Sequence, residues 1–529
     1  MSKAQKSLLG GMTVLGISGI LCKLIGVLFS IPLTHLIGTG GLGLFQSVFP
    51  TYSLLLTVSS AGLPVAVSRM VSHSLTLGDP KSARTIFRVA LYLLAAIGCI
   101  LSIAMLMSTG LLAARVSQPE SRIGFRNIAP CVAIVCIMSA IRGFMQGQQD
   151  MVPTAVSQLI EQVAKVCISL PLAWLGMKTD IVHGAAGALL GITFAEALAL
   201  LYMIFVWHRR RGEFNALPQT GTGPSLSARS AASTLIRISI PITISACIVP
   251  LATFIDSAML VERMMSAGIA LEDARRFYGI QTGLVVRLIN IPTALALSIS
   301  MSLVPAVTAA VASGDKAATV SQSDTGMRFA FLIGLPCSIG MSLLSYGIMR
   351  FVYGSSLTGE ELVLAGELLS MSSLTVVLFT VVQATTAILQ GVRRQWIPMI
   401  TLVAGVAVKI ALNYLLVGRP GLHINGAPIA SLACYTVSMV PNILYAMKYT
   451  GMPFNWKGWL LKPGLAAACM GLVVWGLRSL LPVNALTVLA EVAAGAAVYL
   501  LAAVKLGAIT KEELSRLTRR FTRRKKEAA

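Results

Sequence analysis

Charged residues are scarce in this chain of 529 residues. Asp, Glu, Lys and Arg together make up 12% of the sequence, whereas 56% of the residues are hydrophobic. The mean hydropathy of +0.80 is far above that of a soluble domain of this length. These values exclude an ordinary soluble protein and indicate an integral membrane protein.

Motifs of enzyme active sites are also missing. No G-x-x-x-x-G-K-[ST] loop is present to bind nucleotide, and no D-x-D or Ser/His/Asp arrangement lies in a predicted loop. The five histidines do not cluster, and the nine cysteines are scattered through apolar segments without metal-ligand spacing. An ATP-driven pump or a membrane glycosyltransferase is therefore disfavoured. We predict no enzyme activity, no metal site and no bound cofactor.

Long apolar segments are what the chain has in abundance. A helix needs about 20 residues to cross the hydrocarbon of a bilayer, and segments of that length recur about fourteen times. They are apolar on every face, whereas barrel strands would alternate, so the predicted elements are helices. The predicted spans are 10–37, 42–72, 84–114, 126–145, 153–177, 184–207, 234–262, 278–312, 326–352, 361–390, 396–417, 426–448, 462–481 and 485–507.

The two halves of the chain repeat one another at an offset of about 240 residues. Short matches in a constant order at a nearly constant offset are hard to obtain without duplication. Repeated membrane bundles commonly bind substrate where the repeats meet. We therefore predict an all-α membrane protein with two pseudo-symmetric six-helix lobes and two C-terminal helices. The matched positions are Gly78-Asp79 with Gly314-Asp315, Gln146-Gly147 with Gln390-Gly391, Pro153 with Pro398, Lys165 with Lys409, and Gly184 with Gly426.

A stretch rich in Gly, Pro, Ser and Thr near residues 209–233 is the one segment that has the composition of a linker. It falls between the sixth and seventh spans, where a boundary between lobes is expected. The predicted domains are an N-terminal lobe with the linker, a C-terminal lobe, two further spans and a basic tail. Their bounds are 1–232, 233–454, 455–507 and 508–529.

The net charge of +22 has a distribution that argues against a nucleic-acid partner. Lys and Arg concentrate in the tails and in alternate connections between spans, which predicts that both termini are cytoplasmic. In the tail, Leu514, Leu517 and Phe521 share one helical face among basic residues. That pattern suits an anionic leaflet, although a solvated charge run that only fixes topology is the simpler interpretation.

Ionisable residues inside the spans are the candidates for function. Leaving such a group in hydrocarbon costs on the order of 3 kcal/mol or more unless it faces a partner or a wet cavity. The set leans towards cations, and a cavity lined by Lys and Arg would attract an anion such as phosphate or pyrophosphate. The predicted cavity residues are Lys23, Lys165, Arg237, Arg287 and Lys409.

Glu161 and Asp256 are predicted to serve coupling or charge pairing, and Glu196, Glu367 and Glu491 are the other acids within spans. Glu161 and Lys165 lie one helical turn apart, so they can neutralise one another. Whether Na⁺ or H⁺ acts as a coupling ion is open at this point.

Pro292 and Pro305 flank an apolar stretch next to Arg287. Each proline removes a backbone hydrogen bond and favours a kink. Because alternating access needs helices that bend or rock, we predict a hinge here, although membrane helices also carry proline for purely structural reasons.

Several motifs carry a resemblance to a known family. The residues Gly19 to Gly26, Ile31-Pro32-Leu33-Thr34, Gly43-Leu44-Phe45-Gln46 and Ala61 to Ala66 resemble stage V sporulation protein B and its polysaccharide-exporter relatives. These belong to the multidrug/oligosaccharidyl-lipid/polysaccharide (MOP) flippase superfamily. The likeness extends through Arg287 and reaches about residue 450. It implies two six-helix lobes plus two helices, moving a lipid-linked sugar across a bacterial cytoplasmic membrane.

Two site residues can be carried over from the peptidoglycan-precursor flippases of that superfamily, which line a central cavity with arginines. Arg287, followed by Pro292, is similar to their cavity arginine on the eighth helix, and Lys23 is similar to the first arginine of their first helix. Phe29 and Ser30 stand where a second arginine and its neighbouring acid are expected. The resemblance therefore implies a less basic cavity in this chain.

Together these observations predict a flippase for an undecaprenyl-linked glycan, acting by alternating access. The specific expectation is that the glycan is lipid II, the peptidoglycan precursor, and that the protein acts in spore cortex synthesis. The expected partners are this glycan, the lipid bilayer and cell-wall synthesis enzymes. Two alternatives stay open. One is a cation-coupled multidrug exporter of the same superfamily, which would need buried carboxylates, and the other is a non-transporting scaffold that recruits enzymes through the basic tail.

Overall fold

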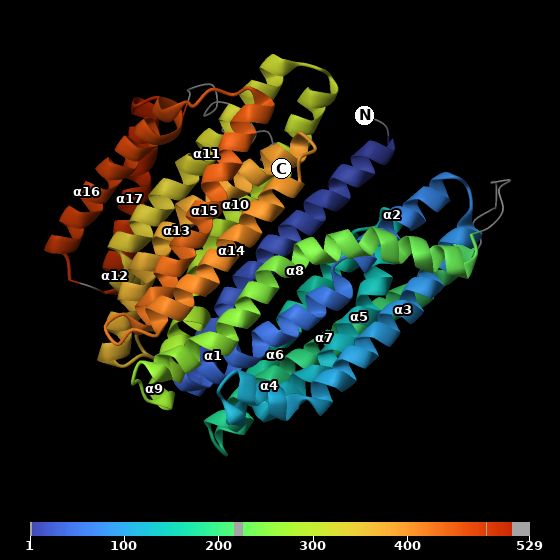
Figure 1. Cartoon of the computed structure of the whole chain (residues 1–529), viewed down its shortest axis with the longest axis horizontal. Coiled ribbons are helices and arrows are strands. Elements are labelled where there is room, and N and C mark those ends of the chain that lie inside the picture. The colour runs from blue at the N-terminus through green and yellow to red at the C-terminus, as the bar shows by residue number, and fades with distance from the viewer. Residues whose placement is uncertain (1–2, 216–225, 483, 510–529) are drawn as a thin grey trace, which may run out of the picture. The chain divides into compact units, whose positions relative to one another are not determined.

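The computed structural model describes residues 3–215, 226–482 and 484–509 and builds them almost wholly into helices (Figure 1). Within these ranges, 13 helical segments are long and apolar enough to cross a membrane. The first helix, α1 (Lys3–Ser60), consists of two helices joined across Gly38. The count therefore agrees with the prediction of about fourteen spans, and the predicted all-α membrane fold is confirmed.

Two compact units make up the chain. The first holds the described residues of 1–284 and 417–424, and the second those of 285–416 and 425–529. After α1, the helices of the first unit are α2 (Leu63–Thr76), α3 (Pro80–Met107), α4 (Thr109–Arg115), η1 (Pro119–Ser121), α5 (Arg122–Gly147), α6 (Val152–Met177), α7 (Ile181–Asn215), α8 (Ala228–Ser266) and α9 (Leu271–Gly279). The lobe boundary predicted at residues 232 and 233 stays a prediction.

The second unit follows a π-helical segment, η2 (Ile280–Val285). Its helices are α10 (Val286–Ala312), α11 (Lys316–Leu343), α12 (Ser345–Tyr353), α13 (Gly359–Gly391), α14 (Trp396–Val417), α15 (Gly426–Thr450), η4 (Lys457–Leu461), α16 (Lys462–Leu480) and α17 (Ala485–Lys505), while the short η3 (His423–Asn425) begins in the part of the first unit at residues 417–424. The tail, with Leu514, Leu517 and Phe521, lies outside the described residues.

The turns before α3 and α11 show the predicted repeat at the level of single residues. Gly78 has φ 70° and Gly314 has φ 71°, a left-handed conformation that glycine adopts without steric cost. The next residue caps the following helix in both copies. Asp79 accepts from the Ser82 backbone N–H at 3.0 Å, and Asp315 accepts from the Ala318 N–H at 2.9 Å. The hydrogen bond from Ser82 also lowers the pKa of Asp79.

Both copies also break the following helix at the same place. The long helices in the spans predicted at 84–114 and 326–352 both end before the predicted span does. They stop at Met107 and Leu343, and the short helices α4 and α12 follow. The linking residues have nearly the same conformation, with φ −94° and ψ 10° at Ser108 and φ −95° and ψ 10° at Leu344.

Glycines bring helix backbones close together within each unit. A Cβ on Gly147 would lie 2.8 Å from Cβ of Val71, and a Cβ on Gly391 would lie 2.7 Å from Cβ of Val307. These two contacts join α5 to α2 and α13 to α10, so they are repeat equivalents. Because lipid tails are as apolar as the side chains, close packing of small residues is a principal source of helix association in a membrane.

The corner of α1 packs tightly against α9. Gly38 turns the chain with φ 64°, and a Cβ on Gly43 would lie 2.2 Å from the Arg275 carbonyl oxygen. The Arg275 side chain is buried and pairs with Glu120 at 2.7 Å. Gln46 Nε2 donates to the Thr282 carbonyl at 2.9 Å. These contacts fix α9 and the start of η2 to the bend of α1.

The two C-terminal spans dock on α11, a point that the sequence left open. Trp459 Nε1 donates to Asp324 Oδ1 at 2.8 Å, and the Tyr499 hydroxyl donates to the Leu332 carbonyl at 2.6 Å. The Arg478 guanidinium donates to the Leu343 carbonyl. Buried residues such as Met470 and Val474 fill the space between these bonds. Helices α16 and α17 are therefore part of the second unit.

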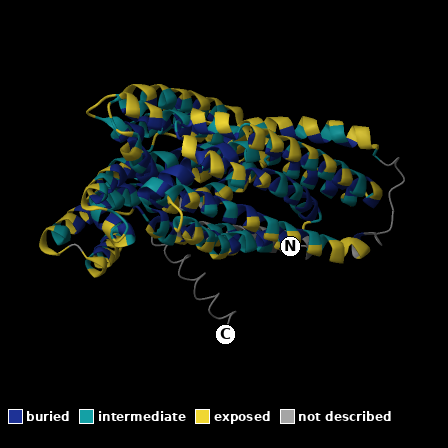
Figure 2. Ribbon diagram, turned by 90° about the horizontal axis from the view of Figure 1, so that it is seen from below, coloured by how far each residue is buried: buried dark blue, intermediate teal, exposed yellow. Residues whose placement is uncertain are grey.

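Exposed residues lie along the outer faces of the helices (Figure 2), and many of them are large and apolar. Tyr92 is 74% exposed and Leu472 is 70% exposed. Large apolar groups in such numbers would be unfavourable in water but suit contact with lipid. The surface therefore agrees with a multi-pass membrane protein.

We expect Gly147→Ala to lower the free energy of unfolding of the purified protein by about 1–3 kcal/mol, because the added methyl group is too large for the contact between α5 and α2. Gly391→Ala should cost a similar amount at the repeat-equivalent contact. Gly476→Ala is the matched control, since nothing lies within 4 Å of its added Cβ and alanine favours a helix. Thermal unfolding in detergent measures all three. An equal rise in stability for Gly147→Ala and Gly476→Ala would contradict the packing assigned here.

Candidate functional site

The predicted cavity residues lie on helices of both units. Lys165 lies on α6 and Arg237 on α8 of the first unit, and Arg287 lies on α10 and Lys409 on α14 of the second. Lys23 lies on α1, with its side chain outside what the structure describes. Arg237 is exposed, whereas Lys165, Arg287 and Lys409 are half-buried. The structure therefore places Lys165, Arg287 and Lys409 partly inside their bundles.

Arg287 presents an unused hydrogen-bond donor inside the second unit. It lies in the first turn of α10, where its charge interacts with Tyr353 at the end of α12. Tyr353 is fully buried. The Nη1 atom of Arg287 is buried and has no hydrogen-bond partner among the described residues. A buried guanidinium nitrogen without a partner is costly, and an anionic oxygen is the partner that it binds best.

Uncharged hydrogen bonds join α14 to α15 in the same unit. Thr401 Oγ1 donates to Asn442 Oδ1 at 2.8 Å, and Ser438 Oγ donates to the Thr401 carbonyl at 3.1 Å. All three residues are buried. Lys409 lies two turns further along α14, half-buried. This contact between α14 and α15 is therefore made by uncharged polar groups.

Ionisable residues gather inside the first unit, on α5, α6 and α7. Arg142 Nη2 lies 3.4 Å from Glu161 Oε2, and their side chains are 14% and 20% exposed. Arg142 Nε donates to Ser157 Oγ at 2.9 Å. Gln162 Nε2 donates to the other carboxylate oxygen of Glu161 at 3.0 Å. This arrangement is a charge-assisted network with several hydrogen bonds rather than an isolated ion pair.

Lys165 reaches from α6 towards two aromatic rings of α1. Its Nζ lies 5.2 Å from the ring centre of Phe29 and 5.7 Å from that of Phe49. Ammonium groups at this distance from a ring face are attracted by its negative charge density. Phe29 is the position where the family pattern expects an arginine. The ring that replaces it therefore contacts a cation from another helix.

Glu196, on α7, is the most buried acid of this group. It is 6% exposed, and its charge interacts with Glu161, Arg142 and Lys165. Its Oε2 atom has no hydrogen-bond partner among the described residues. Tyr52, whose hydroxyl accepts from Cys131 Sγ at 3.2 Å, also lies within electrostatic reach of this carboxyl. We refer to Arg142, Glu161, Lys165 and Glu196 as the charged cluster.

The remaining predicted site residues lie elsewhere. Asp256 is buried on α8 and interacts with Tyr278, whose hydroxyl donates to the Gln46 carbonyl at 3.3 Å. It thus adjoins the corner of α1. Both predicted hinge prolines lie within α10, where Pro292 is buried and Pro305 is exposed. Their hinge role stays a prediction.

Sequence reasoning missed Arg142 and gave little weight to Glu196. Arg142 lies near the end of its predicted span, 126–145, where an arginine commonly reaches the membrane surface. In the structure its side chain instead contacts Ser157 and Glu161 of α6. One signal was available in the sequence: Arg142, Glu161 and Glu196 fall in three consecutive spans. Charged residues in neighbouring membrane helices are costly unless they contact one another.

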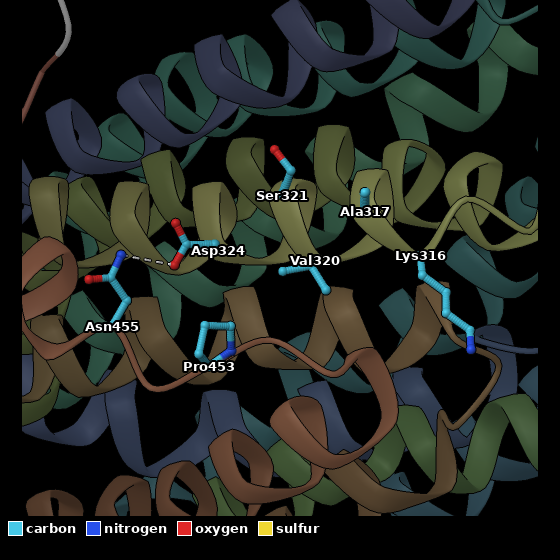
Figure 3. Close-up of a pocket in the computed structure, with 7 residues that line it drawn as sticks. All are labelled: Lys316, Ala317, Val320, Ser321, Asp324, Pro453 and Asn455. Carbon is cyan, nitrogen blue, oxygen red and sulfur yellow. Dashed lines mark hydrogen bonds between the residues drawn. The ribbon is translucent and has the colours of Figure 1, made fainter.

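A groove of about 580 Å³ opens at the start of α11 (Figure 3). Lys316, Val320 and Asp324 of α11 form one wall, and Pro453 and Asn455 form the other. Asp324 already accepts from Asn455 at 3.3 Å and from Trp459. The carboxylate of the groove thus anchors the loop before α16. One exposed lysine beside a carboxylate suits an anion less well than Arg287 does.

Comparison with known proteins bears on these sites. The sequence matches the polysaccharide biosynthesis protein family over residues 8–311 and the MatE family over residues 281–415. It is 28% identical to the lipid II flippase MurJ of Bacillus subtilis (strain 168), with 96% of this chain and 97% of that protein covered. It is 25% identical to stage V sporulation protein B of the same organism, with 97% and 98% covered.

Solved structures share the fold. A lipid II flippase MurJ in an inward closed conformation has a TM-score of 0.71 at 13% identity and covers 93% of this chain and 98% of its own. A MATE family multidrug resistance transporter in an inward-facing conformation has a TM-score of 0.65 at 18% identity and covers 81% and 94%. Because the family match spans more than half of the sequence, the chain belongs to the polysaccharide biosynthesis protein family of the MOP flippase superfamily, whose members are transport proteins and not enzymes.

Proposed function

We propose that this protein is a flippase for an undecaprenyl-linked glycan that carries a diphosphate, with the peptidoglycan precursor lipid II as its substrate. The observation that carries this proposal is the buried Nη1 donor of Arg287, which has no partner among the described residues. Diphosphate oxygens are well matched to a guanidinium fork. The name of the relative MurJ supports lipid II.

In this proposal Arg287 and Lys23 bind the diphosphate, while Lys165, Lys409 and Arg237 add positive charge around the substrate. The sugar occupies the protein interior and the lipid tail stays in the bilayer. Bending of α10 at Pro292 and Pro305 and rocking of the two lobes then expose the substrate on the other side. Glu161 and Asp256 balance charge or couple the movement to an ion.

The place of action belongs to the same proposal. The protein resides in a bacterial cytoplasmic membrane with both termini in the cytoplasm, as the distribution of Lys and Arg favours. Similarity to stage V sporulation protein B supports a role in spore cortex synthesis, where cell-wall synthesis enzymes would receive the flipped precursor.

A second candidate function is cation-coupled drug export within the same superfamily. The MatE match over residues 281–415 favours it, as do the half-buried carboxyl of Glu161 and the buried carboxyl of Glu196. Such an exporter would carry a cationic drug, and the unpartnered donor of Arg287 disfavours a cationic cargo. We therefore place the flippase first.

We expect Arg287→Ala to weaken binding of lipid II to the purified protein about ten- to a hundredfold, since a hydrogen bond to a charged group contributes about 1.5–3 kcal/mol. The affinity of Arg287→Lys should lie between those of the wild type and Arg287→Ala, because lysine keeps the positive charge but cannot form the two parallel hydrogen bonds of a guanidinium group. Arg350→Ala, an exposed arginine on α12, is the control. Binding is measured in detergent, and transfer to the far leaflet is measured in liposomes. Unchanged affinity in Arg287→Ala would exclude the assigned role.

The same liposomes distinguish the second candidate. We expect no efflux of a cationic dye under an imposed proton or sodium gradient, because the proposed binding centre is itself cationic. Transfer of lipid II should proceed in parallel samples of the same preparation. Dye efflux that follows either gradient, together with no transfer of lipid II, would move the assignment to drug export.

A further inference from the structure

Exposed cations and tyrosines gather where the turn between α13 and α14 meets the end of α15. Arg393 and Arg394 lie in the turn, and Tyr445, Lys448 and Tyr449 lie on the last two turns of α15. The guanidinium of Arg394 lies 4.8 Å from the ring centre of Tyr449. The rings of Tyr445 and Tyr449 are stacked, with 6.3 Å between their centres. We refer to these five exposed residues as the arginine–tyrosine patch.

Buried hydrogen bonds between α14 and α15 fix the position of the patch. Thr401, in the second turn of α14, donates to Asn442 of α15 at 2.8 Å. In two antiparallel helices, the residue seven positions before Thr401 lies beside the residue seven positions after Asn442. These residues are Arg394 and Tyr449, and their side chains are in contact. The patch is therefore built on two helix ends whose spacing is set by the interior of the second unit.

The repeat supplies an internal comparison. Its order places Asp150 at the position of Arg394. The residue before each of them is left-handed, with φ 62° at Gln149 and 60° at Arg393, so the two turns share one backbone shape. In the first unit, Asp150 forms an ion pair with Arg210 of α7. In the described part of the second unit, no carboxylate pairs with Arg393 or Arg394. The same turn thus carries an internal ion pair in one copy and two unneutralised positive charges in the other.

The segments that form the patch contain no acid. Residues 391–399 and 443–458 hold Arg393, Arg394, Lys448 and Lys457 but neither Asp nor Glu. Cations in such a cluster attract anions, and near a membrane surface they attract anionic lipids. The charge of the patch therefore calls for an anionic partner from outside these two segments.

Exposed apolar rows lead up to the patch along both helices. On α15, Val440, Leu444 and Lys448 follow one another at intervals of one turn and are all exposed. On α14, Trp396 and Ile400 are exposed with the same spacing. Side chains four residues apart lie on one face of a helix, and indole and phenol rings are enriched where a membrane meets water. A lipid chain that lies along these rows would bring its headgroup phosphate to the patch.

We propose that the arginine–tyrosine patch binds the headgroup phosphate of an anionic phospholipid, in the leaflet on the side of the two termini. Arg393 and Arg394 supply charge-assisted N–H donors, and the ring of Tyr449 holds the guanidinium of Arg394 in place. Lys448 adds charge from the other helix. This inference goes beyond the proposed function and does not depend on which substrate the protein moves. A free phosphate ion shares the headgroup chemistry but has no chain to contact the apolar rows.

Native mass spectrometry of the purified full-length protein, titrated in detergent with phosphatidylglycerol or phosphatidylcholine, tests the patch without lipid II. We expect the wild type to bind phosphatidylglycerol more tightly than phosphatidylcholine. Arg394→Gln should weaken binding of phosphatidylglycerol about fivefold, and the double variant Arg393→Gln/Arg394→Gln about thirtyfold, because each cation near the membrane surface contributes a factor of about five. Binding of phosphatidylcholine should stay unchanged in both variants.

The ring of Tyr449 is tested by two variants of that residue. Tyr449→Leu should weaken binding of phosphatidylglycerol about two- to fivefold, because the guanidinium of Arg394 loses the ring beside it. Tyr449→Phe keeps a ring and should bind like the wild type. Arg229→Gln, at an exposed arginine in the start of α8, is the matched control and should also bind like the wild type. Thermal unfolding without added lipid should be the same for all variants, because the substituted residues are exposed.

Equal affinity of the wild type for the two lipids, or unchanged binding of phosphatidylglycerol in the double variant, would overturn the site. A loss in Arg229→Gln as large as that in Arg394→Gln would overturn it as well, since the attraction would then be one of overall charge. Inorganic phosphate distinguishes a free anion from a lipid. We expect an equal concentration of inorganic phosphate to leave phosphatidylglycerol bound, and displacement of the lipid would overturn the lipid assignment.

Discussion

The cost of placing charge in hydrocarbon is the constraint on which this structure depends. A charged side chain there costs on the order of 3 kcal/mol or more unless it finds a partner. In the first unit, an ion pair and further hydrogen bonds of Arg142 and Glu161 offset this cost. In the second unit, Arg287 keeps a buried donor without a partner in the described part of the chain. The Arg142–Glu161 pair is thus satisfied within the first unit, whereas the donor of Arg287 is the one that the proposed function assigns to an anion.

Packing of small residues supplies the rigid frame for these charges. Gly147 and Gly391 let neighbouring helices approach in equivalent ways, and Asp324 and Tyr499 attach the two C-terminal helices to α11. Hydrophobic burial between helices contributes little in a bilayer, so shape and hydrogen bonds hold each bundle together. The charged residues therefore sit on helices whose spacing is set elsewhere.

Apolar length predicted the spans well, because crossing a bilayer is a one-dimensional requirement that can be read along the chain. The breaks at Ser108 and Leu344 escaped prediction, since neither residue is glycine or proline. Glu161 and Lys165 stood out as charges within apolar runs. Their actual neighbours come from α1, α5 and α7, and contacts between helices far apart in sequence leave no local pattern. For this reason Arg142 could be identified only from the fold.

The left-handed turns at Gly78 and Gly314 also record the history of the chain. A feature that recurs in both halves with nearly the same φ is what duplication of a six-helix ancestor would leave. Glu161 and Glu196 of the first half correspond in the repeat to Gly405 and Ser438 of the second half, so the two halves differ at this helix contact. If the ancestor worked as a symmetric pair of identical chains, it carried two copies of whatever stood at this contact. In a single chain the two copies can differ, and here only the first half carries acids at this contact.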